Sequence, residues 1–167
     1  GAYDFEGAIR AYERALQLAP SQAYIAFTLA ELYRAQGDYD AEIQLLRDMV
    51  ERNPESATAH YNLSLALWRD LGQFEQARAA VESCTAIAPN HVACLSFLGR
   101  LQLRAGEYNL CARSFDRAIQ AGSQNPADYY NGGFCHIVTD NCPRATDILR
   151  QGLALTDDPE TLTDIRD

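Results

Sequence analysis

Two cysteines flank a histidine near the C-terminal end of the chain, in the stretch GGFCHIVTDNCPRA at 132–145. Thiols, imidazoles and carboxylates bind metal ions, and two thiols can instead form a redox pair or a structural disulfide. His91 and Cys94 form a second candidate pair of ligands, with the spacing H-x-x-C. Which chemistry applies depends on where the secondary structure places these groups.

The composition limits the classes of function. The chain has 167 residues, enough for one sizeable core, so we expect a single domain overall. Its net charge of −9 argues against nucleic-acid binding, because phosphates require a basic surface. No apolar run approaches the roughly 18 residues that span a bilayer, so we expect no membrane insertion.

Prolines recur at a nearly fixed interval. Pro20 and Pro54 are 34 residues apart, and Pro54 and Pro89 are 35 apart, a period that indicates stacked supersecondary units. Apolar residues recur at helical spacing on both sides of Gly37, and each proline ends a helix. The pattern therefore predicts that each unit consists of two amphipathic helices joined by a short turn, without strands.

The residues that recur in this pattern resemble the tetratricopeptide repeat (TPR) family. The second unit supplies Leu29, Ala30, Tyr33, Gly37, Tyr39 and Pro54. The third supplies Leu63, Ser64, Gly72, Phe74, Ala77 and Pro89, and the fourth Leu98, Gly99, Gly106, Tyr108, Phe115 and Ala118. The resemblance implies an all-α fold, a right-handed α-solenoid of stacked helix-turn-helix repeats.

The repeat register divides the chain into units. Residues 1–20 are expected to form the second helix of a truncated first repeat, so the chain begins inside a unit. The ranges 21–54, 55–89 and 90–123 are expected to be whole repeats, 124–157 a degenerate repeat, and 158–167 the start of a capping helix.

Two units depart from the family pattern. Glu42 and Met49 replace small residues at points where helices approach closely, so we expect looser packing or a shifted helix register there. In the last repeat, Gly132 and Gly133 lie inside a helix, where each glycine costs roughly 1 kcal/mol relative to alanine. We expect this repeat to be the least stable.

The register also suggests cysteine pairs. Cys135 falls late in a first helix and Cys142 just after the turn, so we expect a disulfide between them, with Cys84 and Cys94 as a weaker second pair. Cys111 would remain a buried, inert thiol. The alternative is five reduced cysteines that serve as small core residues. A disulfide would favour an exported or periplasmic protein, and reduced thiols a cytoplasmic one.

Neither a metal site nor a catalytic site is expected. His136 occupies an aromatic position of the repeat, where it should be a hydrogen-bonded core residue. A structural zinc site needs four convergent ligands, and no nucleophile has a base and an orienting group at a consistent spacing. We therefore expect no cofactor and no enzyme activity.

The family resemblance implies a concave groove lined by the first helices. It selects Tyr24, Phe27, Arg34, Tyr61, Asn62, Leu65, Trp68, Arg69, Arg100, Arg104, Tyr130 and Asn131. Tyr, Trp and Arg often carry interface energy, which favours a non-enzymatic module or scaffold that binds a peptide or protein. The basic clamp that some family members use for chaperone tails is absent. The alternative function is a structural spacer or self-assembly segment that associates end to end through the open half-repeat.

Overall fold

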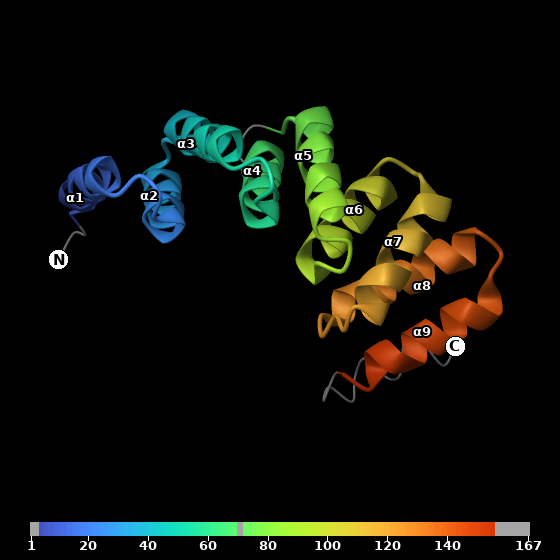
Figure 1. Cartoon of the computed structure of the whole chain (residues 1–167). Helices are drawn as coiled ribbons and strands as arrows, with labels where there is room; N and C mark the ends of the chain where they lie inside the picture. The colour runs from blue at the N-terminus through green and yellow to red at the C-terminus, as the bar shows by residue number, and fades with distance from the viewer. Residues whose placement is uncertain (1–3, 70–71, 156–167) are drawn as a thin grey trace. The chain divides into compact units, whose positions relative to one another are not determined.

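The computed structural model describes residues 4–69 and 72–155 (Figure 1). Over these residues the chain forms nine α-helices and no strand. The helices are α1 (Phe5–Leu18), α2 (Ala23–Gln36), α3 (Tyr39–Arg52), α4 (Ala57–Arg69), α5 (Phe74–Ile87), α6 (Val92–Arg104), α7 (Tyr108–Gln120), α8 (Pro126–Val138) and α9 (Cys142–Leu153). None of these helices combines the length and the apolar character needed to cross a bilayer. The capping helix expected at 158–167 lies outside the described residues.

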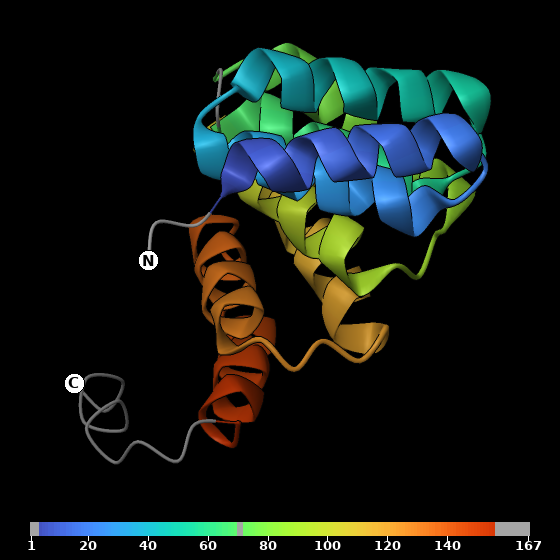
Figure 2. The ribbon, with the colours of Figure 1, turned by 90° about the vertical axis from the view of Figure 1, so that its left-hand side faces the viewer.

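The helices belong to two compact units, Gly1–Ile87 with α1 to α5 and Ala88–Asp167 with α6 to α9. Within each unit, every helix packs against the next one along the chain. Figure 2 shows α1, α2 and α3 running alongside one another in the first unit. Such nearest-neighbour packing is characteristic of repeat proteins.

The turns explain the glycines of the repeat pattern. Gly37 ends α2 with a φ of 84°, a left-handed conformation that glycine adopts without a steric penalty. Asp38 then caps α3, because its Oδ1 accepts a hydrogen bond of 3.1 Å from the backbone N–H of Ala41. Gly106 follows α6 with a φ of 74°. Local sequence thus fixes where a first helix ends and a second one begins.

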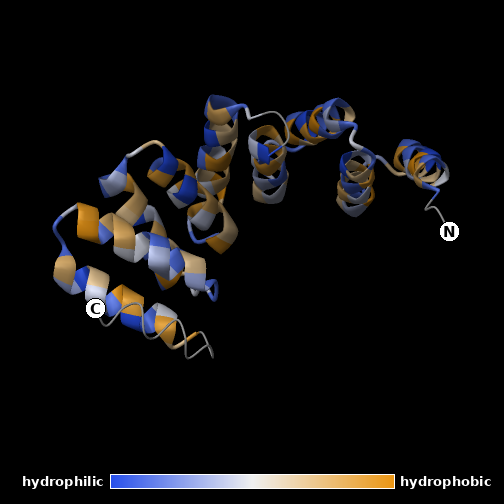
Figure 3. Ribbon diagram, turned by 180° about the vertical axis from the view of Figure 1, so that it is seen from behind, coloured by the Kyte–Doolittle hydropathy of each residue, from blue (hydrophilic) through white to orange (hydrophobic). Residues whose placement is uncertain are grey.

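The core of the first unit is built from α2 to α5. Its buried residues are Ala30, Ile43, Leu46, Leu63, Ala66, Leu67, Ala77 and Ala80. Figure 3 shows hydrophobic and hydrophilic residues sharing the surface of each helix, as amphipathic helices require. Met49 packs against this core although the family pattern has a small residue there.

The core of the second unit is centred on Phe115 of α7, whose side chain is fully buried. A Cβ on Gly99 would lie 2.9 Å from Cε2 of Phe115, and a Cβ on Gly132 would lie 2.9 Å from its Cβ. A Cβ on Gly133 would approach Cγ of Leu149 to 2.6 Å. The interior glycines of α8, expected only to weaken the helix, therefore permit its close approach to α7 and α9.

Candidate functional site

The structure corrects the cysteine pairing. Cys135 of α8 forms a disulfide with Cys111 of α7, with 6.1 Å between the Cα atoms, and Cys142 is an exposed free thiol. The predicted Cys135–Cys142 pair is therefore wrong, and Cys111 is no inert thiol. Cys135 faces the preceding helix rather than the turn that follows it. Cys84 and Cys94 are each disulfide-bonded as well.

His136 is the hydrogen-bonded core histidine that the sequence predicts. The residue is 6% exposed, and Nε2 lies 3.1 Å from Oδ2 of Asp116 on α7. Arg144 of α9 donates to Oδ1 of the same carboxylate from Nε at 3.0 Å and from Nη2 at 2.8 Å. Asp116 of α7 therefore links α7 to both α8 and α9. The hydrogen-bond network gives His136 a structural role.

Four of the predicted groove residues come together in the first unit. Phe27 of α2 and Asn62, Leu65 and Arg69 of α4 line a small cleft of about 70 Å³, which we call the α2–α4 cleft. The remaining lining residues are Ala30, Glu31, Glu42 and Leu46. The cleft thus brings together residues of α2 and α4, the first helices of successive helix pairs, with Glu42 and Leu46 of α3.

The α2–α4 cleft also contains an acidic residue that the groove prediction missed. Glu42 of α3 is 3% exposed, and its Oε1 lies 3.6 Å from Nη2 of Arg69. The missed signal was the glutamate itself, at a position that the family fills with a small residue. A buried carboxylate requires a cation or hydrogen bonds, which the neighbouring repeat supplies.

Other predicted groove residues of the first unit differ in exposure. Tyr24 is 66% exposed, and Tyr61 is half-buried. Arg34 forms an ion pair with Glu31 one turn earlier on α2. Trp68 is half-buried and packs against the core, with its ring edge-on to that of Phe74 at 5.9 Å. Trp68 therefore contributes to packing between α4 and α5.

The predicted residues of the second unit lie on α6 and α8. Arg100 and Arg104 are exposed, whereas Tyr130 and Asn131 are half-buried. Cζ of Arg100 lies 5.1 Å from the ring centroid of Phe97, a cation–π distance. Among the described residues, the buried hydroxyl of Tyr130 has no hydrogen-bond partner.

Comparisons with known proteins agree with the repeat pattern. A family model described as "Tetratricopeptide repeat" matches residues 69–126, and one described as "Anaphase-promoting complex, cyclosome, subunit 3" matches residues 2–84. The chain is a tetratricopeptide repeat protein. It is 26% identical over 139 residues to a Drosophila melanogaster protein named Tetratricopeptide repeat protein 30 homolog. The match covers 81% of this TPR chain but only 20% of that relative.

Solved structures support the same fold. The crystal structure of MamA matches with a TM-score of 0.76 at 22% identity, over 91% of this chain and 88% of that one. YrrB matches with a TM-score of 0.73 at 17% identity, over 98% of this chain and 84% of that one. The fold is therefore an all-α TPR solenoid, as the sequence predicts.

Proposed function

We propose that this TPR protein is a non-enzymatic interaction module that binds a peptide or a partner protein in the concave groove lined by its first helices. The α2–α4 cleft carries the proposal, because it gathers apolar, amide and charged side chains from successive repeats. This mixture suits a protein ligand, whose recognition combines apolar burial with a few oriented polar contacts.

Asn62 is the polar group best placed to receive a peptide. Within the described part of the chain, its side-chain amide has no hydrogen-bond partner, and it lies beside the apolar side chains of Phe27 and Leu65. An amide both donates and accepts, so it can pair with the backbone of an extended segment while a neighbouring ligand side chain is buried.

The relatives support protein binding rather than catalysis. YrrB is described as a TPR protein with an unusual peptide-binding site, and the model that matches residues 2–84 is named after a subunit of a complex. The disulfide between Cys111 and Cys135 supports an oxidising compartment for this module.

The test uses the single tryptophan of the chain, because Trp68 belongs to α4 and its fluorescence should respond to ligands near the α2–α4 cleft. Peptides would be selected on the purified chain from a random library of about 12 residues, long enough to cross two repeats. The selected peptides would then be titrated against wild type and variants.

Leu65→Ala and Asn62→Ala are each expected to weaken binding by about 5- to 30-fold. Leu110→Ala is the matched control, because Leu110 lies on α7, 37% exposed, outside the predicted groove. Circular dichroism would verify that each variant is folded. Equal affinity of wild type and both groove variants would refute the proposed groove.

A further inference from the structure

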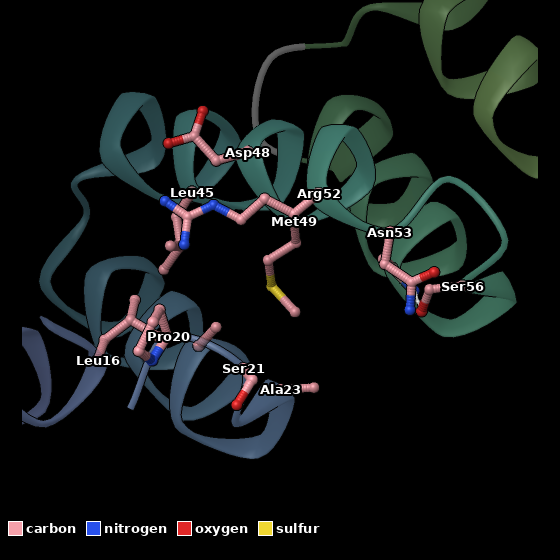
Figure 4. Close-up of a pocket in the computed structure, with 12 residues that line it drawn as sticks. Leu16, Pro20, Ser21, Ala23, Leu45, Asp48, Met49, Arg52, Asn53 and Ser56 are labelled. Atoms are coloured by element: carbon pink, nitrogen blue, oxygen red, sulfur yellow. Dashed lines mark hydrogen bonds between the residues drawn. The ribbon is translucent and has the colours of Figure 1, made fainter. Parts of the chain in front are cut away.

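A second, larger cleft lies between α1 and α3 of the first unit (Figure 4). This α1–α3 cleft has a volume of about 490 Å³, within the size range of ligand sites. Its apolar lining is formed by Leu16, Pro20, Ala26, Leu45, Met49 and Ala59. No residue lines both this cleft and the α2–α4 cleft, so a ligand here would not use the proposed groove.

The cleft follows from the way the helices pack. Both α1 and α3 pack against α2, and the space between α1 and α3 remains open above the segment that connects α1 to α2. Pro20 lies in this segment and Ala23 follows it at the start of α2. Their side chains are short and leave the space unfilled. Residues of α1, α2, α3 and α4 and of the two intervening connections thus line a cleft that is open to solvent.

Met49 makes one wall adaptable. Figure 4 shows its side chain extending from α3 into the cleft, toward Ser21 and Ala23. Methionine is unbranched and polarizable, and binding surfaces use it to accommodate differently shaped apolar groups. Leu45 and Leu16 supply fixed apolar surface on the α3 and α1 sides. A bulky aliphatic or aromatic side chain therefore fits this region.

Arg52 provides the charged group of the cleft. It is exposed, and it makes no hydrogen bond or ion pair with any residue of the described chain. Figure 4 shows its guanidinium beside Leu45 at the cleft. The nearby carboxylate of Asp48 instead accepts a hydrogen bond of 2.8 Å from Gln44. The cation next to the apolar surface is thus available to an anionic partner.

We propose that the α1–α3 cleft is a second docking site, for a peptide segment of a partner protein that carries a bulky apolar side chain next to a carboxylate. The apolar side chain packs against Leu45 and Met49, and the carboxylate pairs with the guanidinium of Arg52. Arginine binds carboxylates through two parallel hydrogen bonds, so this site distinguishes an acidic segment from an amidated one.

The chain offers a specific reporter, because Met49 is its only methionine. Protein labelled with ¹³C at the methionine methyl group gives one signal from this cleft, which Met49→Leu identifies by removing it. The probes are capped tetrapeptides in which Leu, Ile, Phe or Met precedes Asp. They would be added to about 10 mM, enough to occupy most of a site whose Kd is about 1 mM.

We expect at least one probe to shift the Met49 signal saturably. Its Asp→Asn counterpart should bind about tenfold more weakly to wild type, and Arg52→Gln should weaken the acidic probe by a similar factor. Arg47→Gln is the matched control, since Arg47 is exposed on the same helix and bonds to Gln76 instead. It should leave the affinity unchanged.

Three outcomes would overturn the proposal. No saturable shift with any probe would show that the cleft has no such ligand. Equal affinity for the Asp and Asn peptides, or equal affinity of wild type and Arg52→Gln for the acidic peptide, would show that the carboxylate does not pair with Arg52. A signal that depends on protein concentration without peptide would assign the cleft to a second copy of the chain. The Trp68 titration tests the groove independently of all three.

Discussion

Oε1 of Glu42 on α3 lies 3.6 Å from Nη2 of Arg69 on α4, so an ion pair links two successive repeats. Glu42 is 3% exposed, whereas the side chain of Arg69 is 46% exposed. If the pair is broken, the buried carboxylate of Glu42 cannot regain contact with water, whereas the guanidinium of Arg69 can. This asymmetry determines how each partner should respond to substitution.

Arg69→Ala should lower the free energy of unfolding by about 1–2 kcal/mol, because it removes a cation from a buried carboxylate. The same substitution in a Glu42→Gln background should cost clearly less, since no charge then remains to be compensated. Urea unfolding of the two single variants and the double variant measures this coupling. Equal costs in both backgrounds would show that the pair does not stabilise the fold.

Gly133→Ala should destabilise the second unit by about 1–3 kcal/mol, although helix propensity alone favours alanine. The added Cβ would lie 2.6 Å from Cγ of Leu149, closer than real contacts allow. In a Leu149→Ala background, Gly133→Ala should lower the free energy of unfolding by much less than it does in the wild type. Thermal and urea unfolding of the single and double variants provide the measurement, and a stabilised Gly133→Ala protein would contradict the observed packing.

The disulfide between Cys111 and Cys135 should contribute about 3–4 kcal/mol of stability, as expected for two cysteines separated by 24 residues. The Cys111→Ala, Cys135→Ala double variant should unfold at correspondingly lower urea concentration, and Cys142→Ser should not. Peptide mapping of non-reduced protein should recover the linked Cys111 and Cys135 peptides. A link from Cys135 to Cys142 would contradict the structure.

Tyr33 should make the first unit sensitive to alkali. Burial, together with the hydrogen bond of 2.7 Å to Glu13, raises the pKa of Tyr33 from 10 to about 12. The unfolded chain therefore loses this proton at lower pH than the folded one. The contribution of Tyr33 to stability is complete below pH 10 and is lost as the pH rises to about 12.

Tyr33→Phe should cost about 1 kcal/mol at neutral pH and reduce the loss of stability between pH 10 and 12. Urea unfolding of wild type and variant across this range compares the two slopes. Tyr24→Phe is the matched control, because Tyr24 is 66% exposed. Identical alkaline slopes for wild type and Tyr33→Phe would exclude this role for the Tyr33–Glu13 pair.

The sequence by itself determined the repeat fold. Glycine follows the first helices α2, α4 and α6, and proline follows the second helices α1, α3 and α5. These residues and the apolar spacing between them act over a few residues, so no tertiary information is needed to place these helices. The resemblance to the TPR family selected Phe27, Asn62, Leu65 and Arg69, which do line one cleft. It also placed His136 in the core, where it bonds to Asp116.

Only the tertiary structure decided which side chains meet across neighbouring helices. The sequence predicted a disulfide between Cys135 and Cys142 across a turn, yet Cys135 faces α7 and bonds to Cys111. The orientation of α8 about its own axis decides which neighbouring helix a side chain such as that of Cys135 faces. The partner of Glu42 and the α1–α3 cleft likewise depend on contacts between successive repeats. Spacing along the chain predicts neighbours within a helix, whereas packing geometry determines neighbours between helices.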